Sequence, residues 1–217
     1  MSTVATKRAG RSTFPGVRAP RPLLPAAIEK GLTPRQRQVL DTLEELIAED
    51  GLAESTMAQI AARVGCSLRT LYGISPSKDE LVLTVADRRL HRIGREAMAA
   101  LDPEAPPLSA LRNYLRAAHE AVGPSAEAFG RELAAVPGAR RQIDRHEAYL
   151  TGVLKSLLDR AVDEGVIAPV DTTAVALVLG GVGRDFARPD VIPRIEKSSR
   201  ETADALAEIV LRGLERG

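Results

Sequence analysis

The segment from Thr56 to Leu81, TMAQIAARVGCSLRTLYGISPSKDEL, constrains the fold of this chain more than any other part of the sequence. It opens with apolar residues at the i, i+3, i+4, i+7 spacing of one helix face: Met57, Ile60, Ala61 and Val64. Thr56 stands before them as an N-cap, with Gln59 three residues later as its capping-box partner. Gly65 ends the helix, because glycine takes the left-handed conformation without a Cβ penalty.

A second, very short helix follows after a turn of only a few residues. Ser67 can cap it, and it runs over Leu68–Tyr72. Two short helices joined this tightly must cross steeply, which leaves one face of the second helix free to enter a major groove. Pro76 then stops the chain, and Ser77 with Glu80 caps a third helix. The segment predicts a helix-turn-helix that reads DNA.

A helix before this segment supplies the core that two short helices cannot make alone. Thr33 is its N-cap, Pro34 occupies the first helical position and Gln36 completes a capping box. Its apolar stripe consists of Val39, Leu40, Leu43, Leu46 and Ile47. We expect Leu71 and Cys66 to point inward to meet it. A lone cysteine at a turn favours a structural role over a redox role.

These residues resemble the N-terminal domain of the tetracycline-repressor-like (TetR) regulators over roughly residues 33–90. The matching motifs, in the family's order and spacing, are Asp50-Gly51, Thr56, Ile60-Ala61, Gly65-Cys66-Ser67, Thr70-Leu71-Tyr72 and Ser77-Lys78. One departure is Gly73-Ile74-Ser75, where the family has a basic or polar pair followed by an aromatic residue. The departure removes an expected phosphate donor and a core aromatic, so we expect different packing at the end of the recognition helix.

The recognition helix supplies the residues that we expect to face DNA. Arg69 is the candidate for base readout, because a guanidinium can bond guanine O6 and N7 together; the alternatives are a backbone contact or a solvated charge. Thr70 can reach a base or a phosphate. Leu68 either touches a thymine methyl group or packs in the core, and Ser67 lies on the same helix.

The resemblance also implies phosphate anchors, which fix the register on DNA without reading sequence. They are Thr56, Tyr72 and Lys78. The chain begins with a Pro-rich stretch, residues 1–31, that carries Lys7, Arg8, Arg11, Arg18, Arg21 and Lys30 against the single acid Glu29. We expect a flexible basic tail there up to about Pro25, with no apolar face to bury. It either neutralises phosphates or is a solvated extension.

Composition agrees with a globular regulator, since 44% of the 217 residues are hydrophobic and 27% are charged. One cysteine excludes an internal disulfide framework and fits a reducing cytoplasm. No apolar run is long enough to cross a bilayer. The chain has no phosphate loop, nucleophile elbow or zinc-protease motif, so we expect no enzyme activity and no cofactor. His91, His119 and His146 do not have metal-ligand spacing, so no metal site is expected.

Beyond residue 80 every periodic segment is helical, and the predicted fold is all-α: a three-helix DNA-binding domain over residues 32–80 and a helical effector-binding and dimerisation domain over 81–217. Helices are expected at about 81–97, 108–122, 125–135, 140–164, from Thr172 and from Ser198. Apolar residues nearly encircle the segment after Asp171, which also contains Gly180, Gly181 and Gly183. These glycines indicate close helix approach, a kink or an early helix end.

The last two helices carry apolar surface that we expect to form a four-helix dimer interface. Its candidates are Val178, Val182, Leu206, Ile209, Val210 and Leu214. The resemblance also implies a small-molecule cavity, and the sparse polar or aromatic groups of this domain are its candidates, although residues of these types are more often plain core or surface. They are Tyr114, His119, Phe129, His146, Tyr149, Arg184 and Phe186.

Together these observations predict a ligand-responsive transcriptional regulator, a repressor, that binds an inverted-repeat DNA operator as a homodimer. Aromatic residues make up only 3% of the chain, so a small, largely apolar effector is expected to release it. The alternative is a TetR-like interaction protein in which Gly73-Ile74-Ser75 has weakened DNA binding and which acts through its C-terminal surface.

Overall fold

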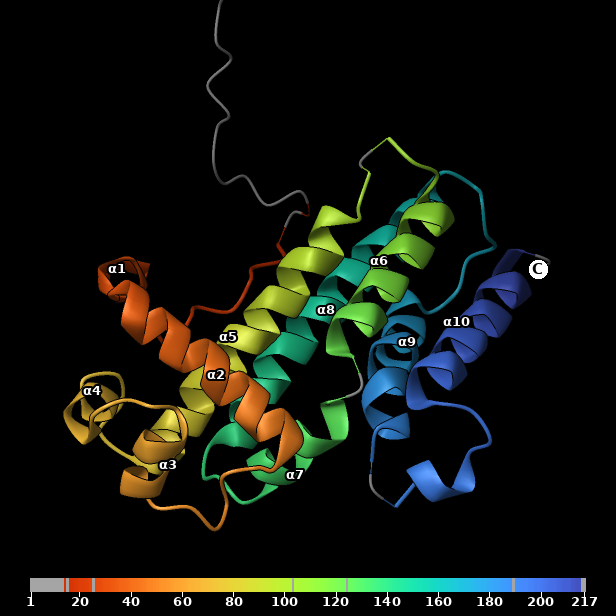
Figure 1. Cartoon of the computed structure of the whole chain (residues 1–217). Helices are drawn as coiled ribbons and strands as arrows, with labels where there is room; N and C mark the ends of the chain where they lie inside the picture. Colours follow the sequence, from red (N-terminus) through yellow and green to blue (C-terminus); the bar gives the residue numbers. More distant parts are fainter. Residues whose placement is uncertain are drawn as a thin grey trace, which may run out of the picture.

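A computed structural model describes residues 14, 16–24, 26–102, 104–123, 125–188 and 190–215. The regular structure of these residues is helical throughout, which confirms the all-α prediction. The elements, drawn in Figure 1, are α1 (Ala26–Gly31), α2 (Pro34–Glu49), α3 (Met57–Arg63), α4 (Leu68–Tyr72), α5 (Lys78–Ala99), α6 (Pro107–Val122), α7 (Ala126–Ala134), α8 (Ala139–Asp163), α9 (Thr172–Phe186), the short 3-10 turn η1 (Ile192–Arg194) and α10 (Ser199–Glu215).

The helix starts follow the capping chemistry of the sequence. Both predicted capping boxes are present, Thr33 with Gln36 before α2 and Thr56 with Gln59 before α3. Ser77 accepts from the amide of Glu80 at the start of α5. These bonds satisfy backbone amides that have no partner within the helix, so the element boundaries are a local property of the chain.

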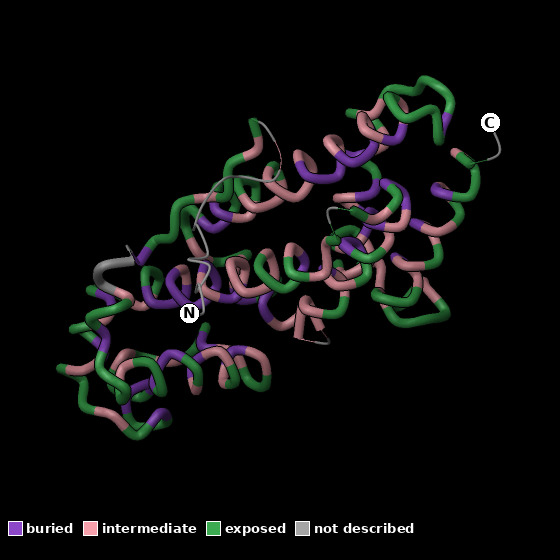
Figure 2. The backbone as a smooth tube through the Cα atoms, turned by 90° about the horizontal axis from the view of Figure 1, so that it is seen from above, coloured by how far each residue is buried: buried purple, intermediate pink, exposed green. Residues whose placement is uncertain are grey.

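Two apolar cores divide the molecule. The first joins α2, α3, α4 and the beginning of α5, with Leu40, Ile60 and Leu71 fully buried. The second joins α6, α8, α9 and α10 with the end of α5, around Leu111, Leu154 and Leu158. Buried stretches recur between exposed ones along the helices in Figure 2, as expected for helices that each turn one face to a core.

Helices α8 and α9 of the second core approach each other closely at a glycine of α9. A Cβ atom on Gly180 would lie 3.0 Å from Thr151 Oγ1 of α8, so the small residue permits the contact. The helix continues without interruption through Gly180, Gly181 and Gly183 to Phe186. Of the three alternatives left open by the sequence, close approach is therefore the one found.

The N-terminal region is more structured than the sequence suggested. We did not predict α1, and residues 16–24, here called the N-terminal strap, lie against both halves of the molecule. Leu24 is buried in the first core, and the Leu23 amide donates to Asp87 Oδ2 at 2.7 Å. Val17 packs on α8 beside Gly152. The expectation that residues up to Pro25 bury no apolar surface is therefore wrong for the strap. Lys7, Arg8, Arg11 and Pro25 lie outside the described residues.

In the part of the chain that the structure describes, no helix is both long enough and apolar enough to cross a membrane.

A buried carboxylate connects the loop after α2 to α7. Glu132 is almost fully buried, and its Oε2 accepts from the amide of Leu52 at 2.9 Å. Leu52 is itself fully buried in the first core. This hydrogen bond fixes the loop that leads into α3.

Replacing Glu132 therefore tests the importance of this contact. Glu132→Ala should lower the free energy of unfolding by about 1–3 kcal/mol, because it leaves the buried Leu52 amide without an acceptor. Glu132→Gln keeps an acceptor of the same shape and should lose much less. Urea unfolding followed by circular dichroism measures both. Equal stability of the Ala and Gln variants would show that the hydrogen bond contributes little.

Candidate nucleic-acid interface

The turn between α3 and α4 is set by the glycine that ends α3. Gly65 has φ +63°, in the left-handed region. The Gly65 amide donates to the carbonyl of Ala62 at 3.2 Å and the Cys66 amide to that of Ala61 at 2.9 Å. These two bonds form a Schellman motif, which closes the helix and reverses the chain within a few residues. The Cys66 side chain is partly buried against the first core, as expected, and burial raises the pKa of its thiol.

α4 is held by one residue and exposed at others. Leu71 is fully buried in the first core, whereas the side chains of Leu68 and Tyr72 are 40% and 51% exposed. Arg69 and Ser67 are exposed as well. Figure 1 shows α4 at the opposite end of the molecule from α10, on an open edge. Of the two alternatives for Leu68, packing in the core is thus excluded, and its apolar surface is available to a partner.

The arginines around this turn differ in whether their side chains have a partner within the chain. Arg35 donates to the carbonyl of Gly65, and Arg63 pairs with Asp50. Among the described residues, the guanidinium of Arg69 has no hydrogen-bond or ion-pair partner, so its five N–H donors are free for an external acceptor.

Two of the hydroxyl groups predicted to touch DNA, those of Ser67 and Thr56, also cap helices. Ser67 Oγ accepts from the amide of Thr70 at 3.1 Å and lies 2.8 Å from Thr70 Oγ1. Thr56 Oγ1 accepts from the amide of Gln59 and donates to its Oε1 at 2.9 Å. A hydroxyl oxygen has a second lone pair, so each can still take part in one more hydrogen bond. These residues therefore have a structural role in addition to any contact with DNA.

Lys78 also has a local role that the sequence did not reveal. Its ammonium group donates to the carbonyl of Leu52 at 3.4 Å and to that of Ala53. The side chain thus ties the loop before α3 to the first turn of α5. Of its three N–H donors, at least one remains for a phosphate.

The segment Gly73-Ile74-Ser75 packs against the first core without the aromatic residue that the family has there. Gly73 ends α4 with ordinary right-handed geometry. Ile74 packs against the first core, and Ser75 is buried with its hydroxyl 3.3 Å from Thr84 Oγ1 of α5. The end of α4 is therefore anchored to α5 by a small polar pair and an aliphatic side chain in place of an aromatic residue.

The candidates for an effector pocket do not form one group. Tyr114 is buried in the second core near Tyr149, and burial, followed by that neighbour, raises its pKa. His119 Nδ1 lies 2.6 Å from Asp204 Oδ1 of α10. Phe129 belongs to the first core, and Phe186 ends α9, where its carbonyl accepts from Ser199 at 2.7 Å.

Another candidate, Arg184, pairs with Glu147 and Asp185. His146 lies beside Asp87 together with His91. His146 Nε2 is 3.3 Å and His91 Nε2 is 3.6 Å from Asp87 Oδ1. Burial lowers the pKa of His91. Burial alone would raise the pKa of Asp87, but hydrogen bonds from His146 and from the Leu23 amide outweigh it and lower that pKa. We missed this cluster because only Asp87 and His91, one helical turn apart, are neighbours in sequence.

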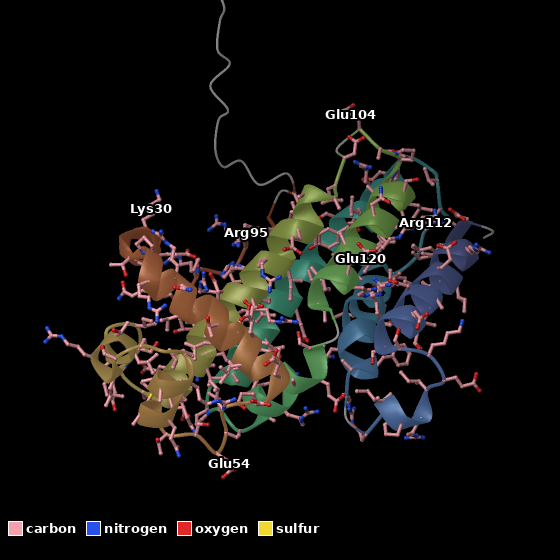
Figure 3. The ribbon with its side chains drawn as sticks, in the orientation of Figure 1. Lys30, Glu54, Arg95, Glu104, Arg112 and Glu120 are labelled. Atoms are coloured by element: carbon pink, nitrogen blue, oxygen red, sulfur yellow. The ribbon has the colours of Figure 1, made fainter. Side chains whose placement is uncertain are left out.

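None of the predicted pocket residues lines either of two hollows found among the described residues. One, of about 420 Å³, lies between α6 and α10, with Leu115, Ala207 and Leu211 at its buried side and Arg112 and Glu208 among its charged residues. The other, of about 130 Å³, lies between α2 and α5 and is lined by Asp87 and His91 among others. Figure 3 shows Arg112 beside α10.

The predicted dimer residues differ in exposure. Ile209 of α10 is 67% exposed and Val178 of α9 is 53% exposed, and neighbouring Leu177 is 59% exposed. Leu206, Val210 and Leu214 are half-buried along α10. Val182 is buried within the chain itself, so it belongs to the interior of this fold.

Comparison with known proteins agrees with this geometry. Residues 39–85, which span most of α2 through the first part of α5, match the family of bacterial regulatory proteins called the tetR family. No curated protein matches this chain in sequence.

Solved structures match over most of the chain. A TetR-like transcriptional regulator from Rhodococcus sp. RHA1 is 26% identical, with a TM-score of 0.63 over 83% of this chain and 95% of that one. The TetR family transcriptional regulator PfmR from Thermus thermophilus is 24% identical, with a TM-score of 0.62 over 82% and 100%. A TetR transcription regulator from Haloarcula marismortui shares the fold at 21% identity, with a TM-score of 0.67 over 83% and 97%.

The motif order, the helix-turn-helix geometry and the family match agree: the N-terminal domain of this chain matches the tetR family of bacterial regulatory proteins, with α3 and α4 as its DNA-binding helix-turn-helix, and the chain shares its fold with solved TetR regulators.

Proposed function

We propose that the protein is a ligand-responsive transcriptional repressor that binds an inverted-repeat operator as a homodimer. The observation that carries the proposal is the state of α4: Leu71 fixes the helix to the core while Arg69, without a partner in the described chain, is presented at the open edge beside Leu68. A fixed helix with a free guanidinium suits the major groove, where bidentate contact distinguishes guanine from other bases.

The dimer is proposed from the outer face of α9 and α10. Leu177, Val178 and Ile209 are large apolar side chains that a monomer leaves in water. Such a concentration on two packed helices favours burial against a second copy. Two recognition helices could then reach successive major grooves, about 34 Å apart.

The effector is proposed to be small and largely apolar and to enter the domain beyond Leu108. The buried side of the hollow between α6 and α10 is aliphatic, with Leu115 and Leu211, while its charged edge could hold one polar group. Release requires that the effector and DNA weaken each other's binding by the same factor. The pocket residues predicted from the sequence remain a hypothesis, since they are spread over both cores.

The alternative is an interaction protein with weakened DNA binding. It rested on Gly73-Ile74-Ser75 at the end of the recognition helix. Ile74 and Ser75 pack into the first core and leave α4 supported, which favours the DNA-binding proposal. A gel shift on the upstream DNA of the gene separates the two functions, because only a DNA-binding regulator should retard a fragment that contains an inverted repeat.

The role of Arg69 can be tested by substitution. Arg69→Ala should weaken binding to the operator by about 1–3 kcal/mol and relax the preference at one base pair, because it removes a base contact. Lys78→Ala should weaken binding to operator and scrambled DNA alike. Fluorescence anisotropy with both DNAs measures these effects. An unchanged sequence preference in Arg69→Ala would refute base readout by this side chain.

The dimer face can be tested at its most exposed residue. Ile209→Glu should give monomers, because it places a charge in the apolar interface. It should also abolish operator binding, because the DNA-binding domain of a single protomer makes few contacts with DNA. Leu68→Glu is the matched control: it should lose DNA binding but stay dimeric. Light scattering and anisotropy measure the two properties. A dimeric Ile209→Glu variant, or a monomeric wild type, would exclude this interface.

The N-terminal residues can be tested by two deletions. Removing residues 1–13, which include Lys7, Arg8 and Arg11, should keep the fold and reduce the slope of log affinity against log salt by up to about 3, roughly one per phosphate contact. Removing residues 1–24 should in addition lower the melting temperature, because the strap buries Leu24 and bonds Asp87. Identical salt slopes for the full chain and the first deletion would show that the tail does not contact DNA.

A further inference from the structure

Three metal-ligating side chains meet where the N-terminal strap, α5 and α8 come together. Asp87 and His91 lie one turn apart on α5, and His146 approaches from α8. We propose that these residues form a binding site for a divalent transition-metal ion of the zinc class, with Asp87 Oδ1 and the two imidazoles as ligands. The site shares no residue with the proposed DNA or dimer contacts, so the proposal does not depend on them.

The distances already suit a tetrahedral ion. Metal bonds of about 2.0–2.2 Å in tetrahedral geometry place two ligand atoms about 3.3–3.6 Å apart. Asp87 Oδ1 lies 3.3 Å from His146 Nε2 and 3.6 Å from His91 Nε2. One donor atom from each of the three residues lies within 4.8 Å of the others. A small rotation of the imidazoles would therefore bring the two histidine nitrogens to the same separation. An ion placed among them would replace the contacts between these side chains.

The two oxygens of Asp87 have different surroundings. Oδ2 is fixed by the Leu23 amide at 2.7 Å, whereas Oδ1 faces both histidines. Gln142 of α8 donates to Oδ1, and the second lone pair of that oxygen can take the metal. A ligating carboxylate held by hydrogen bonds from surrounding groups is the usual arrangement at metal sites, since those bonds orient it.

His91 provides the second, independent observation. Its Nε2 atom is fully buried and has no hydrogen-bond partner among the described residues. A buried polar atom without a partner costs about 1–3 kcal/mol, so it calls for an explanation such as an ion or a water molecule. This same nitrogen is the one that faces Asp87 Oδ1.

The adjacent hollow gives an ion a way in and a place for further ligands. Its volume of about 130 Å³ is enough for several water molecules, and Asp87 and His91 both line it. A site with three protein ligands and a fourth position open to water is the usual form of a non-structural zinc site. Two imidazoles and one carboxylate favour zinc, cobalt, nickel or iron(II) over magnesium or calcium, which prefer oxygen ligands.

The acidic and basic side chains around the hollow balance one another, so they do not repel a cation. Arg88 pairs with Asp41 at 3.2 Å, and Arg92 pairs with Glu44. Arg95 also lines the hollow, and Figure 3 shows it projecting from α5 toward the side of Lys30. Glu29, Asp41 and Glu44 line the same space and offset the three arginines, which leaves the charge of Asp87 available to the ion.

Metal titration of the full chain tests the site directly. The protein, made without a histidine tag and treated with a chelator, is titrated with Co²⁺, whose visible absorption reports its geometry, and then with competing Zn²⁺. We expect one ion per chain. His91→Gln and His146→Gln should each weaken binding more than about tenfold, the lower bound seen when even an outer-shell partner is lost.

His119→Gln is the matched control, because the third histidine of the chain pairs with Asp204 and lies outside the cluster. It should bind Co²⁺ as the wild type does. In NMR spectra, Zn²⁺ should shift the imidazole signals of two histidines and leave that of His119 unchanged. Circular dichroism confirms that each variant is folded, and if one glutamine variant is not, the other and the NMR shifts still decide. Absence of saturable binding by the wild type, or a loss caused equally by His119→Gln, would overturn the proposal.

Discussion

Helix α5 is the element on which the rest of the structure depends, because one continuous helix contributes to both cores. Its first turns place Leu81 and Val85 in the first core, that of the DNA-binding domain. Its last turn places Ala97 in the second core, that of the C-terminal domain. Between them lies Arg89, a guanidinium only 8% exposed. A buried charge is costly unless it is paired. Arg89 donates to Glu44 of α2 and to the carbonyl of Val122 at the end of α6, and its guanidinium lies 4.4 Å from the ring centroid of Phe129 in α7.

This arrangement explains how the C-terminal domain could act on DNA binding. The helix-turn-helix is attached to α5 through Leu71, Ser75 and Lys78, so it follows α5 as a unit. The far end of α5 packs with α6, and α8 lies alongside. A ligand that changes the packing of α6 or α8 would therefore change the direction of α5 and, in a dimer, the separation of the two recognition helices. The physical requirement is different affinity of the ligand for the two arrangements.

The polar groups buried along α5 divide into two sides. Arg89 faces α2, α6 and α7, where it joins the DNA-binding domain to the C-terminal domain. Asp87 and His91 face the N-terminal strap and α8, where Leu23 and His146 meet them. Each polar group lies between elements that are distant in sequence. If an ion binds at Asp87, it would strengthen the junction between α5 and α8.

The sequence alone determined the parts of the fold that depend on local chemistry. The caps at Thr33, Thr56, Ser67 and Ser77, the glycine turn at Gly65 and the stripe with Leu40 and Leu43 were all predicted, because each is fixed by residues within a turn or two. The exposed face of α4 followed from them. Only the tertiary structure showed that Lys78 ties a loop, that the strap covers Asp87, and that Val182 is interior while Ile209 is not. His91 and His146 are far apart in sequence, and their meeting depends on how α5 packs against α8, which no local pattern encodes.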